Sequence, residues 1–393
     1  MNKNILHADA QDFISKNLDA DIISILLKKS PFDKISSPEI VAQIEAKKKC
    51  LNKLPTWFKT PNLYYPKKIN IEQTSSEITA QYKSQIVSGK RLLDLTGGFG
   101  IDSYFFSNKI EQVSYNELDQ ELVEIVSHNF EILGKKNIKI SRDDAINFLK
   151  RSTDHYDWIY VDPDRRNKKK GKVFLLEDCL PDVTKHLELF FDKADHILLK
   201  TSPLLDISLG IKTLHQVAEV HIIAVRNEVK ELLWVLKKSF KGDVIKKTIN
   251  FTKAGEEIFD FKIFQEKIAI SKFGLPEAYL YVPNAAILKS GGFKIIGDQL
   301  NLNKLAEHTH LYTSKQFIDF PGKRFTIQQV HNFNKKTLKK LNLKKANIAT
   351  RNFPLSVSKI RIKFNINDGG DVFLFFFKNC MNTYQFLVCS KKF

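Results

Sequence analysis

Cysteine and histidine are too sparse and too scattered in this sequence to suggest a metal site. The 393 residues include four cysteines, and their spacing is not typical of metal ligands: Cys50, Cys179, Cys380 and Cys389. His308 and His310 are the only closely spaced histidines, and a lone pair of this kind is more typical of a loop or a helix cap. We therefore expect free thiols and no bound metal.

Long apolar runs are also absent. The sequence has no stretch of eighteen apolar residues and no apolar N-terminal segment of the signal-peptide type. It has neither an internal repeat nor a low-complexity tract. We expect a soluble protein located in the cytoplasm.

Negative charge is scarce in the last part of the sequence. The chain has 62 Lys and Arg against 44 Asp and Glu, a net charge of +18. Residues 321–393 contain fifteen Lys and Arg but only two acids, Asp368 and Asp371, so this segment alone carries +13. A concentrated positive field attracts polyanions such as RNA. The alternative is a generally lysine-rich protein whose solvated faces happen to be basic.

The basic segment nevertheless has the composition of a folded domain. It contains aromatic residues and the strand-like run Val372–Phe377, which a disordered basic tail would lack. We expect the phenylalanines of this run to be core residues rather than a platform for stacked bases.

Residues 92–106 combine a short apolar run, a glycine-rich turn and a helical pattern. This order predicts a strand, a tight turn and a helix. Gly98 and Gly100 have no Cβ, so the backbone can pass close to a ligand there. Ser103 stands where a dinucleotide-binding fingerprint would need its third glycine. A purely structural corner between strand and helix remains the alternative.

The spacing of Asp94, Gly98 and Gly100 resembles the first motif of class I S-adenosylmethionine-dependent methyltransferases. Thr96 stands where that motif usually has its first glycine, which calls for a less tight bend. The resemblance implies that S-adenosyl-L-methionine binds at this turn, through Asp94, Thr96, Gly97, Gly98, Phe99 and Gly100.

Further acids follow the next strand-like segments. Glu117 lies at the end of segment 112–118, and Asp144 follows segment 138–141. The resemblance implies that Glu117 and Leu118 bind the ribose hydroxyls of the cofactor, and that Asp144 and Ala145 border its adenine.

Each of these acids also has a simpler explanation. Asp119 and Asp144 are placed to cap helices, and Asp162, near the end of the strand-like segment 156–164, can form a turn. However, all of these acids fall at successive strand ends of one alternating series. That edge is where open α/β sheets bind ligands, so the series favours a binding site.

Strands and helices continue to alternate to about residue 265. Further strands are predicted over residues 195–201, 219–225 and 246–251, with helices over 175–191 and 228–239. The expected fold is α/β: a Rossmann-like, seven-stranded, doubly wound methyltransferase sheet with an N-terminal helical subdomain and a small α+β C-terminal region. In the N-terminal part, Ser37 is expected to cap a helix that has Pro38 at its first position.

Four longer motifs narrow the resemblance. They lie at residues 72–83, 162–166, 200–206 and 226–233, and together they resemble a bacterial methyltransferase family with a C-terminal THUMP-like domain. Residues 281–289 and 346–355 extend this resemblance. In related RNA methyltransferases, a THUMP-type domain holds the RNA while a Rossmann-like domain does the chemistry. The resemblance therefore implies a tRNA or rRNA substrate.

Asp162, Pro163 and Asp164 form the candidate catalytic turn. If an exocyclic amine of an extruded or single-stranded base is methylated, Asp162 and the Pro163 carbonyl can accept its two hydrogens. The familiar Asp/Asn-Pro-Pro-Tyr/Phe pattern is broken here, because Asp164 replaces the second proline and Arg165 the aromatic residue. Methylation of a ring nitrogen, with Asp162 or Asp164 as general base, therefore stays open.

A basic cluster follows this turn directly. Its candidate RNA-binding residues are Arg165, Arg166, Lys168, Lys169 and Lys170. A loop at the mouth of the site can clamp phosphates, and a solvated linker is the alternative. Arg351, within the C-terminal resemblance, is a further candidate for RNA contact.

The predicted domain order has four parts. We expect a helical subdomain over residues 1–71, the methyltransferase domain over 72–265, a ferredoxin-like segment over 266–320 and the basic THUMP-like domain over 321–393. Two other functions stay open: a methyltransferase acting on a protein or small molecule, and a non-catalytic RNA-binding protein on the same fold.

Overall fold

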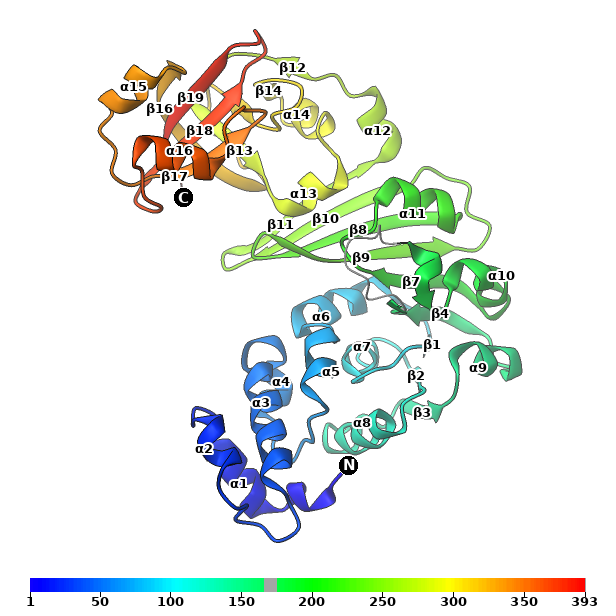
Figure 1. The fold of residues 1–393 in the computed structure, drawn as a ribbon. Coiled ribbons are helices and arrows are strands. Elements are labelled where there is room, and N and C mark those ends of the chain that lie inside the picture. The colour runs from blue at the N-terminus through cyan, green and yellow to red at the C-terminus, as the bar shows by residue number, and fades with distance from the viewer. Residues whose placement is uncertain (166–174, 393) are drawn as a thin grey trace. The chain divides into compact units, whose positions relative to one another are not determined.

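The computed structural model describes residues 1–165 and 175–392, and the chain divides into two compact units (Figure 1). The first unit contains residues 1–217 and 234–240, and the second contains residues 218–233 and the chain from residue 241 onward. Within the described residues, no helix is both long and apolar enough to cross a bilayer.

The regular structure at the start of the first unit is helical. Its helices are η1 (Lys3–Leu6), α1 (Ala8–Lys16), α2 (Ile22–Leu26), α3 (Ser37–Lys53), α4 (Pro55–Lys59), α5 (Lys68–Gln73) and α6 (Glu77–Ile86). The prediction that Ser37 caps α3 is wrong by one residue. Ser36 is the N-cap, and its hydroxyl and the Glu39 carboxylate form a reciprocal capping box.

A parallel sheet forms the centre of the first unit. Five strands lie in the order β7-β4-β1-β2-β3, and all of their pairings are parallel. They are β1 (Arg91–Asp94), β2 (Gln112–Glu117), β3 (Ile138–Arg142), β4 (Tyr156–Val161) and β7 (Ala194–Thr201). Apolar side chains of β1, β4 and β7 are almost fully buried, as expected for strands covered on both faces.

Helices lie on both sides of this sheet (Figure 1). α7 (Ile101–Phe106) and α8 (Gln120–Ile132) lie on one side, and α9 (Ala145–Arg151) and α10 (Val183–Lys193) lie on the other. This alternation confirms the predicted doubly wound, Rossmann-like fold class. α11 (Ile207–Leu214) follows β7.

The predicted helix over residues 175–191 starts later than expected. Its first part forms η2 (Leu176–Asp178) and the two-residue strand β6 (Cys179–Leu180), which pairs with β5 (Asp164–Arg165). α10 begins only at Val183, because Pro181 interrupts the helical pattern and Asp182 then caps the helix.

The predicted helix over residues 228–239 is wrong, because this segment forms strand β9 (Glu228–Lys237). Arg226 and Asn227, which separate β9 from β8 (Val217–Val225), both have positive φ values of 52° and 65°. Two such residues between strands form the tight turn of a β-hairpin. β9 is buried continuously from residue 231 to residue 236, so it lacks the alternation that distinguishes a strand from a helix.

The second unit contains β10 (Ile245–Thr252) and β11 (Gly255–Lys262), all of β8 except Val217, and the first part of β9, to residue 233. β10 pairs in parallel with β8 and antiparallel with β11. β8 and β10 confirm the predicted sixth and seventh strands, whereas β9 and β11 are additional.

The rest of the second unit is built around one eight-stranded sheet. Its order is β12-β14-β15-β13-β16-β19-β18-β17. The strands are β12 (Lys272–Phe273), β13 (Tyr279–Pro283), β14 (Asn303–Lys304), β15 (Tyr312–Ser314), β16 (Gly322–Asn332), β17 (Asn347–Arg351), β18 (Val372–Lys378) and β19 (Tyr384–Lys392). The helices are α12 (Ile263–Ile268), α13 (Ala285–Ser290), α14 (Ile295–Gln299), α15 (Lys335–Lys340) and α16 (Val357–Phe364).

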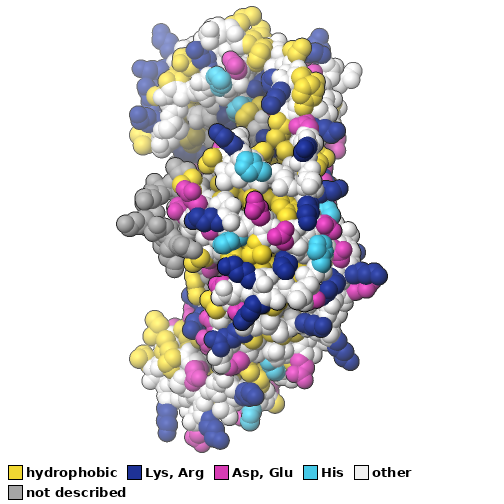
Figure 2. Space-filling model, turned by 90° about the vertical axis from the view of Figure 1, so that its right-hand side faces the viewer, with side chains coloured by type: hydrophobic (Ala, Val, Ile, Leu, Met, Phe, Trp, Pro, Cys, Tyr) yellow, Lys and Arg dark blue, Asp and Glu magenta, His cyan; other side chains and the backbone are white. Residues whose placement is uncertain are grey.

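One buried cluster of this sheet joins residues from both predicted C-terminal segments. Leu280 and Leu311 pack in the same core as Phe325, Phe375 and Leu387. The phenylalanines of β18 are largely buried, as expected. The second unit is at the top of Figure 2. On the face drawn there, Lys and Arg side chains are spread over its surface with few acids among them.

Candidate active site

The turn after β1 contains three glycines that have different surroundings. A Cβ on Gly97 would lie 2.1 Å from the Tyr115 ring, and one on Gly100 would lie 2.7 Å from Phe130. Aromatic side chains therefore occupy the space beside both glycines, and no larger residue fits there. Gly98 has a φ of +54°, and a Cβ there would meet only the Thr96 carbonyl oxygen, at 3.9 Å. Gly98 is therefore the glycine whose surface is open to a ligand.

Hydrogen bonds join the ends of the four strands β1 to β4. The Asp162 amide donates to Thr96 Oγ1 at 2.7 Å, which links β4 to the turn after β1. The Gly98 amide donates to Glu117 Oε2 at 2.8 Å, which links that turn to β2. Asn116 Nδ2 donates to the Asp143 carbonyl oxygen at 3.1 Å, which links β2 to the loop after β3. The strand ends that the sequence singled out therefore meet along one edge of the sheet.

Glu117 is held in place by backbone amides. Besides Gly98, the amides of Leu118 and Asp119 donate to its Oε1, at 2.8 and 2.9 Å. Its side chain is half-buried, whereas Leu118 is exposed. Asp119 is also the N-cap of α8, as its alternative explanation required.

Asp94 is fully enclosed, with only 1% of its surface exposed. Its carboxylate accepts hydrogen bonds from Ser103 Oγ at 2.6 Å and from the Thr96 amide at 3.2 Å. Burial raises the pKa of Asp94 to about 8. Asp94 therefore fixes the glycine turn to the start of α7 and does not lie on an open surface.

Two other predicted cofactor residues have clear structural contacts. Asp144 is exposed and caps α9, accepting from the amides of Ile146 and Asn147 at 3.1 and 3.0 Å. Phe99 is buried, and its ring lies 6.2 Å from that of Trp57. Ala145, the first residue of α9, is half-buried.

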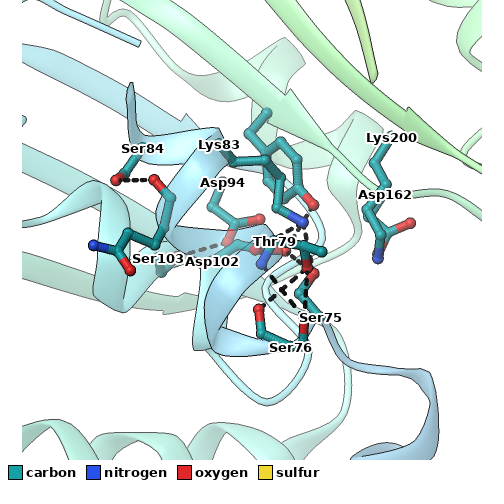
Figure 3. A network of polar contacts seen from close by, with 12 residues as sticks. Ser75, Ser76, Thr79, Lys83, Ser84, Asp94, Asp102, Ser103, Asp162 and Lys200 are labelled. Carbon is teal, nitrogen blue, oxygen red and sulfur yellow. Dashed lines mark hydrogen bonds and ion pairs between the residues drawn. The ribbon is translucent and has the colours of Figure 1, made fainter. Parts of the chain in front are cut away.

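A buried polar network lies beside this edge and was not anticipated from the sequence (Figure 3). Lys83, on α6, is 0% exposed, and its Nζ lies 3.0 Å from Asp102 Oδ1 and 2.7 Å from Ser75 Oγ. The other oxygen of Asp102, on α7, accepts from the hydroxyls of Tyr160 and Ser75, at 2.7 and 2.9 Å. Ser75 and Lys83 lie in the motif at residues 72–83, which is the only signal for this network that the sequence offered. A lysine on a helix is usually solvated, so the motif alone did not predict that Lys83 is buried.

The network carries a stable ion pair. Although burial acts to raise the pKa of Asp102, the positive charges of Lys83 and Lys200 lower it overall. Asp102 therefore stays ionised while its neighbour Asp94 holds its proton near neutral pH.

Lys200 is the first residue of the motif at residues 200–206, but the sequence did not assign it a role. It lies on β7, with only 12% of its side chain exposed, and forms an ion pair with Asp162 Oδ2 (Figure 3). Pro163 is half-buried, and Asp164, in β5, is exposed. The Asp162 carboxylate is therefore held by β7 at the end of β4.

The other predicted RNA-binding residues lie mostly outside the described residues. Arg166, Lys168, Lys169 and Lys170 fall in the segment 166–174, and only the strand backbone of Arg165 is described. Arg351 lies in the second unit, half-buried on β17, where its Nη1 donates to the Thr350 carbonyl oxygen at 3.0 Å.

Over residues 1–165 and 175–392, the structure contains no group of three or more His, Cys, Asp or Glu side chains able to hold a metal ion.

The buried position of Asp94 predicts a specific pH dependence. Its folded pKa of about 8 lies above the unfolded value, so the protein loses stability as pH rises between the two values. Asp94→Asn should therefore flatten the decline in the free energy of unfolding between about pH 5 and about pH 7 by roughly 3 kcal/mol. Urea unfolding followed by tryptophan fluorescence measures this in the first unit, which contains Trp57, Trp158 and Trp234. If the free energies of unfolding of the wild type and of Asp94→Asn changed in parallel with pH, the raised pKa of Asp94 would be contradicted.

Known protein families and a solved structure resemble this chain. Residues 279–321 match a ferredoxin-like domain family, and residues 322–391 match a THUMP domain-like family. A solved structure from Porphyromonas gingivalis W83, assigned as a methyltransferase, is 30% identical, with both chains covered completely and a TM-score of 0.90.

An uncharacterised RNA methyltransferase of Mycoplasma mobile is 27% identical over 110 residues, which are 28% of this chain and 30% of that protein. The match thus spans less than a third of that curated relative. The full-length structural relative is decisive, and the two domain matches locate the THUMP-like part. The chain therefore belongs to the class I S-adenosylmethionine-dependent methyltransferase family that has a THUMP-like domain at its C-terminal side.

Proposed function

We propose that this protein uses S-adenosyl-L-methionine to methylate a base nitrogen of RNA, in tRNA or rRNA. The observation that carries the proposal is the hydrogen-bonded edge formed by the ends of β1 to β4. On this edge the open surface of Gly98 lies directly beside the Glu117 carboxylate.

The residues of this edge fit the chemistry of the cofactor. Its ribose presents two hydroxyl donors, and the Glu117 carboxylate is a half-buried acceptor next to a glycine with no Cβ. Asp144 and Ala145 would border the adenine, because the Asn116–Asp143 hydrogen bond brings the start of α9 to the end of β2. When bound, the cofactor supplies an electrophilic methyl carbon on a sulfonium.

The other residues of the turn would shape the site rather than contact the ligand through their side chains. Asp94 and Phe99 are buried, and Gly97 and Gly100 pack against aromatic rings. The Thr96 hydroxyl accepts the Asp162 amide and so fixes the distance between the cofactor turn and the catalytic turn.

Asp162 is the proposed acceptor for the target nitrogen. Lys200 binds its Oδ2, which orients Oδ1 to accept a hydrogen bond or a proton from the base. The Pro163 carbonyl would take the second hydrogen of an exocyclic amine. Methylation of a ring nitrogen, with Asp162 or Asp164 as the base, is the alternative within the same site.

The RNA substrate is supported by three independent observations. The second unit contains the strongly basic residues 321–393, a THUMP-like domain matches there, and the Mycoplasma mobile relative is named as an RNA methyltransferase. The basic cluster Arg165–Lys170 and Arg351 are the proposed phosphate contacts. A methyltransferase acting on a protein or small molecule is the second candidate.

The role of Glu117 can be tested by cofactor binding. Glu117→Ala removes a charged acceptor of two hydroxyls, so the Kd for S-adenosylhomocysteine should rise by about 10- to 100-fold. Isothermal titration calorimetry measures this directly. Asp119→Asn is the matched control, because it alters a carboxylate two residues away that caps α8 and should leave the Kd within about twofold. Equal effects of the two variants would mean that Glu117 acts only through local folding.

The reaction itself can be tested on cellular RNA. Modified-nucleoside profiles of RNA from cells with and without this gene should differ by one methylated nucleoside, and the purified protein with labelled cofactor should restore it. Asp162→Asn should lower this turnover by about 100-fold or more while the cofactor Kd stays within about twofold, because the acid acts on the substrate nitrogen. Identical nucleoside profiles, with label entering protein instead, would favour the second candidate.

A further inference from the structure

An exposed aromatic ring in the second unit has two cations within about 6 Å of its centre. Phe317, in the loop between β15 and β16, is 39% exposed. The Cζ of Arg324 lies 5.6 Å from the centre of its ring, and the Nζ of Lys392 lies 5.5 Å from it. Tyr279 packs edge-on against the same ring, with the ring centres 5.5 Å apart.

The sheet sets the spacing of this cluster. Arg324 on β16 and Lys392 on β19 are direct cross-strand partners, so their side chains leave the same face of the sheet. β13, which carries Tyr279, is the neighbour of β16 on the edge opposite β19. The Nζ of Lys392 lies 5.8 Å from the centre of the Tyr279 ring. Three neighbouring strands and one loop thus contribute to one patch, defined here as the Phe317 patch.

The loop that carries Phe317 is fixed by a buried side chain. The Tyr281 hydroxyl accepts from the Ile318 amide at 3.0 Å and donates to the Gln316 carbonyl oxygen at 3.1 Å. These bonds hold the backbone on both sides of Phe317, and Phe320 anchors the loop in the core. An exposed ring that is held in advance binds a flat partner at a lower cost in conformational entropy.

The chemistry of the patch favours a nucleotide. A base stacks on an exposed aromatic face, and two adjacent cations neutralise the phosphates that flank it. An acidic peptide would use the cations but not the ring. A duplex keeps its bases stacked inside the helix, so the base must be unpaired.

We propose that the Phe317 patch binds an unpaired base of the RNA substrate, with the base stacked on Phe317 and its phosphates beside Arg324 and Lys392. This inference rests on the proposed function, because it assumes that the substrate is RNA. Asp319 pairs with Arg324 at 2.6 Å and is itself almost fully exposed. A phosphate that binds Arg324 must therefore displace Asp319, whereas a phosphate can bind Lys392 without displacing a carboxylate of the described residues.

The test uses the full-length protein and a labelled single-stranded oligoadenylate, with binding measured by fluorescence anisotropy. Phe317→Ala should weaken binding by about tenfold, the effect expected for one stacked base, and Phe317→Tyr should restore it. Lys392→Ala should reduce the slope of log affinity against log salt by about one phosphate contact. Tyr384→Ala is the matched control, because Tyr384 is 40% exposed with one cation, Lys378, 6.0 Å away, and should leave the affinity unchanged.

Three results would overturn the proposal: Phe317→Ala binding oligoadenylate as tightly as the wild type, polyglutamate competing as well as RNA, or no binding by the wild type. Cofactor titration of the same proteins separates this failure from failure of the proposed function. Wild-type protein that binds S-adenosylhomocysteine and methylates RNA, with Phe317→Ala unaffected, would contradict the Phe317 patch alone. Wild-type protein that binds oligoadenylate through Phe317 but binds no cofactor would contradict the methyltransferase proposal alone.

Discussion

The hydrogen bonds between the ends of β1, β2, β3 and β4 constrain everything that is built on that edge of the sheet. The two register partners of Asp94 are tyrosines, and each uses its hydroxyl to hold a neighbouring part of the site. Tyr115 donates to the Gly98 carbonyl oxygen, and Tyr160 donates to Asp102. A one-residue slip in the register of β1 would turn Asp94 to the other face of the sheet and separate these contacts. Strand register and site geometry are therefore parts of the same constraint.

The buried pair of Lys83 and Asp102 extends this constraint to the N-terminal helices. Removing two charges from water is costly, and the pair is tolerated because Ser75 and Tyr160 supply hydrogen bonds around it. The ion pair therefore connects α6 directly to α7, the helix that follows the glycine turn. Lys200 on β7 forms a second lysine–aspartate pair, which holds the Asp162 carboxylate at the end of β4.

Much of this architecture was predictable from the sequence, for identifiable reasons. The seven predicted strands are confirmed, because short apolar runs ending in acids and turn formers are clear signals. Their ends agree within two residues, except that the strand predicted over residues 156–164 ends three residues earlier, at Val161. β9 was missed because its buried residues do not alternate, although the Arg226–Asn227 turn was a usable signal. Lys83 and Lys200 lie in the motifs 72–83 and 200–206, but their roles were missed because a lysine in a sequence gives no sign that folding will bury it beside an acid. The residue roles and the domain boundaries stay predictions, and the boundary near residue 320 crosses a shared core.

In the proposed function, the first unit carries out methyl transfer and the basic second unit attracts RNA. The central claim of this proposal is that the joined strand ends bind the adenosine part of the cofactor. The most direct measurement is a crystal structure of the protein with S-adenosylhomocysteine. We predict that both ribose hydroxyls lie within hydrogen-bonding distance of the Glu117 carboxylate, with the ligand passing over Gly98. A ligand bound at another surface, with Glu117 still hydrogen-bonded only to its three backbone amides, would contradict the account.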